Sequence, residues 1–148
     1  MEMSKIIAAN GTDDAGQWHI WRSKFFDKAA KCEGELKRLS GSAADAKLHF
    51  KAMAEKILST NKAGKTKLEK NEAVIKLLEE LIPLIELRAE LAHSHFVCAT
   101  DLDAGLAMFK NANSSHIHFD KLTVLSGEQR KKAYDRLASI AGQLAKVI

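Results

Sequence analysis

Two residues near the middle of the chain, Arg88 and His93, have side chains suited to chemistry on phosphate esters. They lie in the segment "IPLIELRAELAHSHF", residues 82–96, at the end of a leucine-rich stretch. A guanidinium keeps its proton and binds phosphate through paired N–H donors, whereas an imidazole exchanges a proton near neutral pH. On a straight helix the two side chains would lie about 140° apart, so sharing a site requires the helix to unwind after Ala92.

Arg88 also has a purely structural interpretation. It follows Ile85 by three positions, which places it on the apolar stripe of the predicted helix. A buried guanidinium is costly without a partner, so Arg88 must reach a carboxylate of another helix, a helix end or a bound anion. Glu86 and Glu90 are close in the sequence but lie on other faces. His93, in turn, could interact with the negative end of the helix dipole.

Histidine and cysteine side chains around the same segment suggest an alternative, a zinc site. In an extended strand, residues two positions apart point the same way, so "HSH" and "HIH" could each offer two nitrogens. The candidate ligands are His93, His95, Cys98, His116 and His118. Their spacing matches no standard zinc pattern, and solvated histidines on a hairpin are the structural alternative.

A third candidate surface is aromatic and lies near the N-terminus. Its aromatic residues, at helical spacing, are Trp18, Trp21, Phe25 and Phe26. Arg22 and Lys24 are interleaved with them, a combination that can stack on nucleic-acid bases and bind phosphates. Aromatic residues at this spacing more often form a core or a dimer contact.

Helices must position these residues, because most of the sequence has helical periodicity. Apolar residues recur at three- and four-residue steps over three stretches, about residues 14–39, 43–59 and 67–92. Pro83 lies inside the third pattern, which continues in phase past it, so we expect one kinked helix rather than two. Ser126 and Gln129 match the capping box and predict the start of a last helix.

Between the third and the last helix the periodicity changes to short β-type runs. "FVCAT" and "LAMF" flank the turn-forming "DLDAG", which predicts a small β-hairpin or loop excursion over residues 96–122. The predicted fold is therefore an all-α, four- to five-helix bundle with a kinked third helix and this excursion before the last helix. An amphipathic helix cannot bury its stripe alone, so the helices must pack on one another or on a second copy.

Length and composition limit the class of protein. The chain has 148 residues, which suits a single domain over residues 1–148 with a loose N-terminal arm at 1–11. A formal net charge of +4 permits a polyanionic partner without requiring one. Two distant cysteines predict no disulfide framework, and the apolar runs are too short for a signal peptide or a membrane span. We therefore expect a cytoplasmic protein that does not enter a membrane.

The segment "LRAELAHSHF", followed by a short insertion and by "LSGEQRKKAYDRLASIAGQLAKV", resembles the C-terminal half of a HEPN domain (higher eukaryotes and prokaryotes nucleotide-binding). The motif of that family is an arginine, four to six residues and then a histidine, near the end of one core helix. Arg88 and His93, with four residues between them, match it, and the resemblance covers about residues 67–148. Family members often carry a polar residue directly after the arginine, where this chain has Ala89.

The resemblance implies an all-α, usually dimeric domain that cleaves RNA without a metal or other cofactor. The 2′-hydroxyl would attack the adjacent phosphate and leave a cyclic phosphate end. His93 would act as general base or acid, and Arg88 would stabilise the charge on the phosphate. His95 and Glu90 are the candidate supporting residues. A homodimer would bring two such pairs into one cleft, and many such proteins are toxins or phage-defence proteins with a neutralising partner protein.

Three functions remain open on the sequence. A HEPN-like endoribonuclease that acts on RNA is favoured by the spacing of Arg88 and His93. A non-catalytic HEPN-like module that binds a partner protein or a nucleotide is favoured by Ala89. A plain structural dimer is the third.

Overall fold

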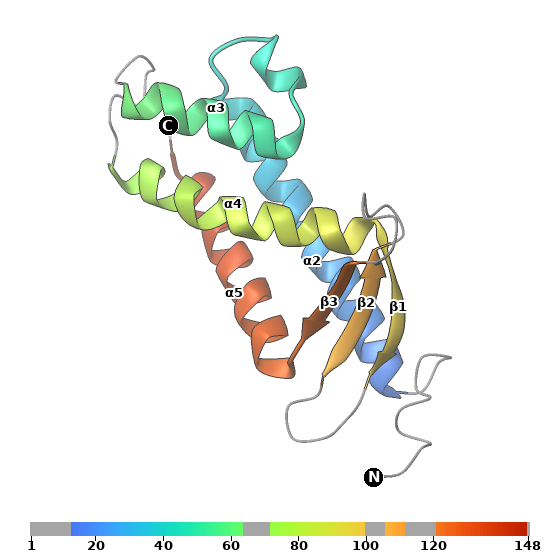
Figure 1. Cartoon of the computed structure of the whole chain (residues 1–148). Coiled ribbons are helices and arrows are strands. Elements are labelled where there is room, and N and C mark those ends of the chain that lie inside the picture. The colour runs from blue at the N-terminus through green and yellow to red at the C-terminus, as the bar shows by residue number, and fades with distance from the viewer. Residues whose placement is uncertain (1–12, 64–71, 100–105, 112–120, 148) are drawn as a thin grey trace. The chain divides into compact units, whose positions relative to one another are not determined.

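The structure is a computed structural model that describes residues 13–63, 72–99, 106–111 and 121–147 (Figure 1). The predicted arm at residues 1–11 lies outside them. The described chain is mostly helical, and none of its helices combines the length with the apolar content that crossing a bilayer requires. Its elements in chain order are α2 (Asp13–Leu39), the 3-10 helix η2 (Asp45–Lys47), α3 (Phe50–Lys62), α4 (Glu72–Ala92), β1 (Ser94–Ala99), β2 (Ala107–Asn111), β3 (Lys121–Leu125) and α5 (Gly127–Leu144).

The chain divides into two compact units, each assembled from separate pieces of sequence. The first unit consists of Met1–Phe26 and Arg88–Tyr134, and the second of Asp27–Leu87 and Asp135–Ile148. The boundaries fall inside α2, α4 and α5, so each of these helices contributes one part to each unit. The two units have different cores.

The first unit contains a three-stranded sheet in the order β1-β2-β3, with both pairs antiparallel. Residues that face each other across neighbouring strands share a side of the sheet, which puts Phe96, Phe109 and Thr123 on one side. Phe109 is fully buried. Its ring centroid lies 6.1 Å from that of Trp18 and 5.5 Å from that of Phe96, both edge-on. This side of the sheet therefore packs on α2 through aromatic rings.

The two tryptophans of α2 belong to the same aromatic core. The rings of Trp18 and Trp21 lie 5.7 Å apart, and Trp21 stacks on Phe25 at 5.2 Å. The Trp21 indole N–H donates to the carbonyl of Arg130 at 2.9 Å, and the Arg130 guanidinium lies 4.6 Å from the Trp18 ring. These contacts join α2 to the start of α5, although 109 residues separate Trp21 from Arg130.

The second unit has a core of aliphatic side chains from helices. Its buried residues include Met53, Ala54 and Ile57 on α3, Val74, Leu77, Leu78, Leu81, Leu84 and Ile85 on α4, and Leu137, Ile140, Ala141 and Leu144 on α5. At the surface, two ion pairs of 3.0 Å, Lys51 with Glu86 and Lys62 with Glu79, join α3 to α4. Asn61 is the single buried polar residue among those described, and its amide has no hydrogen-bond partner there.

Cys32 lies in this second core, on α2. It is fully buried, and its Sγ lies 3.8 Å from the carbonyl oxygen of Leu137. Burial, and after it the charge of Glu35, raises the pKa of the Cys32 thiol to about 12. The thiol therefore stays protonated at neutral pH and acts as a small apolar side chain.

Several local predictions are confirmed. Helix α2 ends at Leu39 as predicted, and α4 passes through Pro83 without interruption. The capping box of α5 is formed in both directions. The backbone N–H of Ser126 donates to Oε1 of Gln129 at 2.8 Å, and the N–H of Gln129 donates to Oγ of Ser126 at 3.0 Å. These features depend on residues that are close in the sequence.

The second helix and the β excursion differ from the prediction. Helix α3 begins at Phe50 rather than near residue 43, because Leu48 and His49 have extended backbones and a 3-10 turn precedes them. The excursion is a three-stranded sheet that begins at Ser94 and ends at Leu125, not a hairpin over residues 96–122. The chain is thus mostly helical rather than all-α, since the sheet supplies part of one core.

Candidate functional site

Arg88 lies near the end of α4, in the part of the helix that belongs to the first unit. Its side chain is exposed, which shows that the predicted place on the apolar stripe is wrong. The stripe belongs to the second unit and ends at Ile85, whereas beyond Leu87 the helix contributes Leu91 to a different core. The Arg88 guanidinium lies 5.9 Å from the centroid of the Phe26 ring and makes no ion pair with the residues that the structure describes.

His93 directly follows α4, where the helix gives way to strand β1. Its backbone N–H donates to the carbonyl of Ala89 at 3.3 Å, and the Ser94 hydroxyl donates to the carbonyl of Glu90. These bonds close the last helical turn, so the backbone turns out of the helix at His93. His93 is therefore the first residue beyond α4, and the chain leaves the helical path directly after it. The His93 side chain is exposed.

The two candidate supporting residues occupy different places around this junction. His95 is exposed on β1 and pairs with Lys110 of β2. Because side chains alternate along a strand, His95 lies on the opposite side of the sheet from Phe96. Glu90 is half-buried on the last turn of α4. The structure thus brings Glu90 to the same helix end as the Arg–His pair and puts His95 on the other side of the sheet from the aromatic core.

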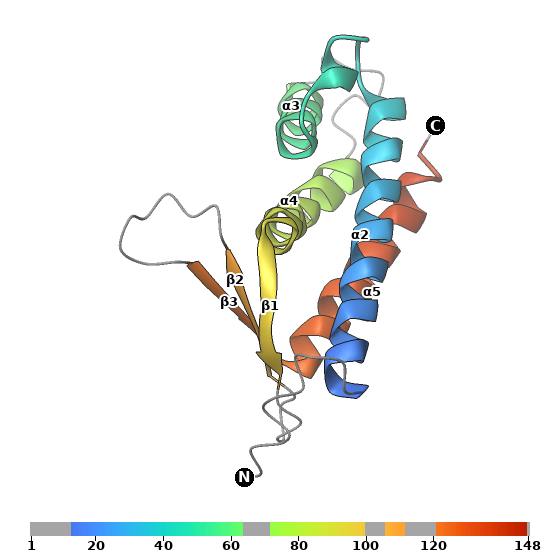
Figure 2. The ribbon, with the colours of Figure 1, turned by 90° about the vertical axis from the view of Figure 1, so that its right-hand side faces the viewer.

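Residues 88–96, which join the end of α4 to the start of β1, form the junction. Within the first unit, one face of α2 lies along this junction, where the first half of α2 and strand β1 lie side by side (Figure 2). Three residues of α2 at steps of three and four positions each contact one residue of the facing segment. We call the six residues the α2 seam: His19, Arg22 and Phe26 on α2, with Phe96, Ser94 and Arg88 facing them. Successive turns of α2 thus meet successively earlier residues of the junction.

Two contacts of the seam fix the position of β1 against α2. The ring centroids of His19 and Phe96 lie 5.0 Å apart. The Nη1 of Arg22 donates to the carbonyl oxygen of Ser94 at 3.1 Å. Ser94 follows His93 directly, so Arg22 holds the backbone next to the candidate catalytic histidine.

Arg22 is the half-buried cation of the seam. Its guanidinium also lies 5.7 Å from the centroid of the Phe109 ring, and no carboxylate in the described part of the chain pairs with it. Burial lowers the pKa of Arg22 below its ordinary value, although an arginine remains protonated. The seam therefore contains a partly desolvated positive charge whose partners are a neutral carbonyl and an aromatic ring.

The aromatic surface considered near the N-terminus is mostly core. Trp18, Trp21 and Phe25 are buried, so their rings are not accessible to bases. Phe26 is half-exposed, as is Arg22. Helical spacing predicts a shared face, but it does not reveal which edge of that face reaches solvent.

The zinc alternative receives no support from the described residues. Among them, no group of three or more His, Cys, Asp or Glu side chains could hold a metal ion. His116, His118 and the side chain of Cys98 lie outside the described residues. The remaining two candidates, His93 and His95, do not make a site alone.

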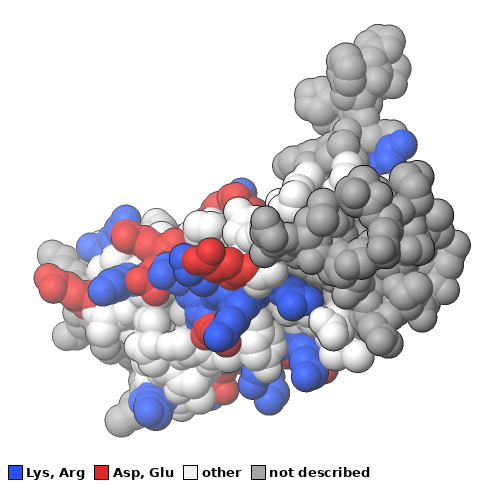
Figure 3. Space-filling view, turned by 90° about the horizontal axis from the view of Figure 1, so that it is seen from below, with Lys and Arg blue, Asp and Glu red and all other residues white. Residues whose placement is uncertain are grey.

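Charges of both signs are mixed on one face of the molecule. On the face seen in Figure 3, Lys and Arg side chains are interspersed with Asp and Glu. The net charge of +4 therefore gives only modest long-range attraction for a polyanion. Local affinity would depend on cations such as Arg22 and Arg88 of the first unit, which pair with no acidic side chain among the described residues.

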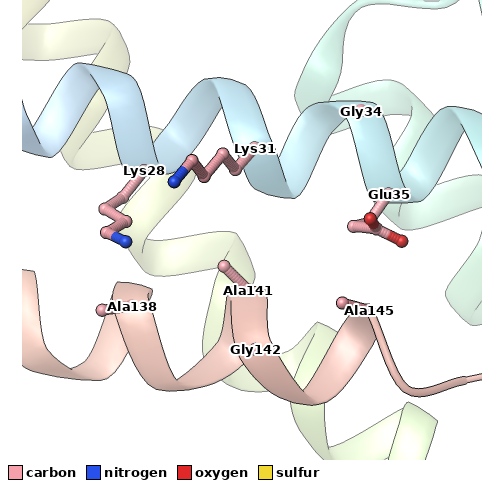
Figure 4. A pocket seen from close by; sticks show the side chains of 8 residues that line it. All are labelled: Lys28, Lys31, Gly34, Glu35, Ala138, Ala141, Gly142 and Ala145. Atoms are coloured by element: carbon pink, nitrogen blue, oxygen red, sulfur yellow. The ribbon is translucent and has the colours of Figure 1, made fainter.

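The second unit has a groove between α2 and α5, which the sequence analysis missed (Figure 4). Its volume is about 400 Å³. The lining residues are Lys28, Lys31, Gly34, Glu35, Ala138, Ala141, Gly142 and Ala145. A Cβ added at Gly34 or Gly142 would meet no atom within 4 Å, so the protein itself leaves this space open. Glycines inside two helical patterns were the available signal. The lining offers no histidine, cysteine or hydroxyl group for catalysis.

Comparisons of the chain with protein-family models, with curated proteins and with solved structures find no match.

Proposed function

We propose that this chain is a metal-independent endoribonuclease of the HEPN kind, with Arg88 and His93 at its active site. The observation that carries the proposal is the change from α4 to β1 directly at His93. It leaves Arg88 on the helix and His93 off it, with both side chains exposed and both in the first unit. Because Arg88 pairs with no carboxylate among the described residues, its charge is available to a phosphate.

The proposed reaction is an intramolecular transesterification of RNA, in which the phosphorus exchanges its bond to the 5′-oxygen for a bond to the 2′-oxygen. The 2′-oxygen loses its proton to a base and attacks the adjacent phosphorus, and the bond to the 5′-oxygen breaks as that oxygen gains a proton. The products are a 2′,3′-cyclic phosphate end and a 5′-hydroxyl end. His93 supplies one proton transfer, and in a homodimer the His93 of a second copy supplies the other. Arg88 stabilises the negative charge that grows on the phosphate oxygens.

Cleavage of a mixed-sequence RNA in the presence of EDTA tests the proposal. Replacement His93→Ala should lower the cleavage rate by about 10²–10⁴-fold, the usual contribution of a general acid or base. The matched control is His49→Ala, because His49 is also exposed and its side chain makes no capping bond to α3. Equal cleavage by wild type and His93→Ala would reject the assignment, as would activity that EDTA abolishes.

Arg88 has its own test and control. Arg88→Ala should slow cleavage by about 10²-fold or more, because a charge-assisted contact to the transition state is lost. Arg136→Ala is the matched control, because Arg136 is exposed on α5 and its replacement removes the same charge. If both variants slow cleavage equally, the effect of Arg88 is one of net charge.

The second candidate function is a non-catalytic HEPN-like module that binds a partner protein or a nucleotide. RNA at the same surface is the nucleotide ligand that Arg88 would suit. Ala89 favours it, because an exposed alanine stands where the related domains often carry a polar group. This module would bind RNA with Arg88 and leave it intact. Detecting no cyclic phosphate ends in products of the wild-type protein, together with retained RNA binding, would favour this candidate over the enzyme. If the enzyme is a toxin or a phage-defence protein, a neutralising partner protein would have to cover the Arg–His pair.

A further inference from the structure

Arg22 is a cation for which the described structure contains no negative partner. It is half-buried, and within the described part of the chain its guanidinium makes one hydrogen bond, to the Ser94 carbonyl, out of the five that its N–H groups allow. In the second unit, by contrast, Lys51 and Lys62 have carboxylate partners at 3.0 Å. A partly desolvated charge without such a partner is unfavourable unless a ligand supplies one.

The surroundings of Arg22 suit an anion with an attached aromatic group. Arg88 lies in the same seam and also has no carboxylate partner among the described residues. Phe26 and Phe96, which flank Arg22 along the seam, are half-buried aromatic residues. Glu90, the acidic residue of the junction, is half-buried. Guanidinium groups beside accessible rings are the combination that binds the backbone and the bases of single-stranded nucleic acid.

We infer that the α2 seam binds a second phosphate of single-stranded RNA, with Arg22 as the phosphate-binding residue. This inference rests on the proposed function and extends it, because it names the substrate class and a contact outside the Arg88–His93 pair. Arg22 receives the phosphate through its remaining N–H donors while its Nη1 stays on the Ser94 carbonyl. An unpaired base stacks on the solvent-accessible part of Phe26 or Phe96, whereas a base in a duplex stays stacked on its neighbours.

The same geometry gives Arg22 a link to catalysis. Its bond to Ser94 holds the residue next to His93. RNA that occupies the seam would therefore be held on the same stretch of backbone that carries the catalytic histidine. Loss of Arg22 should weaken RNA binding first.

Binding of a 2′-O-methyl oligoribonucleotide tests the inference separately from cleavage. This probe lacks the attacking hydroxyl, so the wild-type protein can bind it but not cut it. Arg22→Gln keeps a donor for the Ser94 carbonyl and removes the charge. Measured by fluorescence anisotropy, it should bind roughly tenfold more weakly and lower the salt dependence by about one counterion. The matched control, Lys24→Gln, removes an exposed charge from the same helix and should change affinity by less than about twofold.

Each outcome is decisive for the seam. No binding of the probe by wild type, or equal affinities of Arg22→Gln and Lys24→Gln, would overturn the inference. Binding that depends on Arg22 without cleavage of ordinary RNA would uphold the seam and reject the enzyme. If Arg22→Gln loses helicity by circular dichroism, Arg22→Lys replaces it. That variant keeps the charge but not the planar donor pair, and wild-type affinity in it would also overturn the inference.

Discussion

The arginines of the first unit and two lysines of the second have different neighbours, although the first unit also contains an ion pair, Lys132 with Glu128. In the first unit three arginines lie over aromatic rings: Arg22 over Phe109, Arg88 over Phe26 and Arg130 over Trp18. In the second unit Lys51 and Lys62 pair with carboxylates of α4. A ring positions a cation without neutralising it, whereas a carboxylate cancels its charge. Under the proposed function, anion binding is therefore expected at the arginines of the unit with the aromatic core.

The first prediction tests whether the two cores are one cooperative structure. Phe25→Ala in the first core and Leu78→Ala in the second should each lower the free energy of unfolding by about 3–5 kcal/mol, because both side chains are fully buried. Both tryptophans lie in the first unit, so fluorescence reports on that unit and far-UV circular dichroism on all helices. Since α2, α4 and α5 contribute to both units, the two signals should share one denaturation midpoint in both variants. A shift confined to fluorescence in Phe25→Ala would separate the cores.

The second prediction tests how the buried amide of Asn61 affects the stability of the aliphatic core in the second unit. Asn61→Leu should raise the free energy of unfolding by about 1–2 kcal/mol, because it replaces a buried amide without a described hydrogen-bond partner by an apolar group of the same branching. Asn61→Asp is the matched opposite and should destabilise the protein, since it buries a carboxyl group in an aliphatic core. Urea denaturation measures both. A less stable Asn61→Leu protein would mean that the amide has a polar partner in solution.

The third prediction concerns the groove of the second unit and has the smallest effect. Gly34→Ala and Gly142→Ala should each stabilise the protein by about 0.5–1 kcal/mol, because the added methyl groups meet open space and glycine weakens a helix interior. Ala30→Gly, at an exposed position of α2, is the reverse control and should lose a similar amount. Destabilisation by either alanine, measured by thermal denaturation, would show that the groove is closed in solution.

Much of the fold could be predicted where its cause is local. The stripe of α2 and the reciprocal bonds of Ser126 and Gln129 depend on residues a few positions apart, and both predictions are confirmed. The early start predicted for the second helix followed the recurrence of apolar residues at three- and four-residue steps over residues 43–59. In the structure Phe50 enters the core, and the extended Leu48 and His49 before it set the helix start instead.

The candidate site shows what periodicity could not predict. The spacing of Arg88 and His93 pointed to phosphate chemistry, but phase alone put Arg88 on a buried stripe. After Leu87 the buried residues of α4 belong to the core of the other unit. This change depends on tertiary contacts, which the local sequence pattern does not contain. The partnership of Arg22 with Ser94, 72 residues away, was beyond sequence reasoning for the same reason. The third strand was missed because its pairing with β2 is decided by tertiary contacts.

Both cores are assembled from distant pieces of sequence, which limits how far the chain can fold while the ribosome is still synthesising it. Trp21 can contact Arg130 only after a further 109 residues have been synthesised, and Cys32 can contact Leu137 only after a further 105. Neither core can close while only the first half of the chain has left the exit tunnel. The amphipathic helix α2 therefore emerges with its apolar stripe uncovered for most of synthesis, and nascent chains of this protein should bind hydrophobic-surface chaperones until α5 is complete.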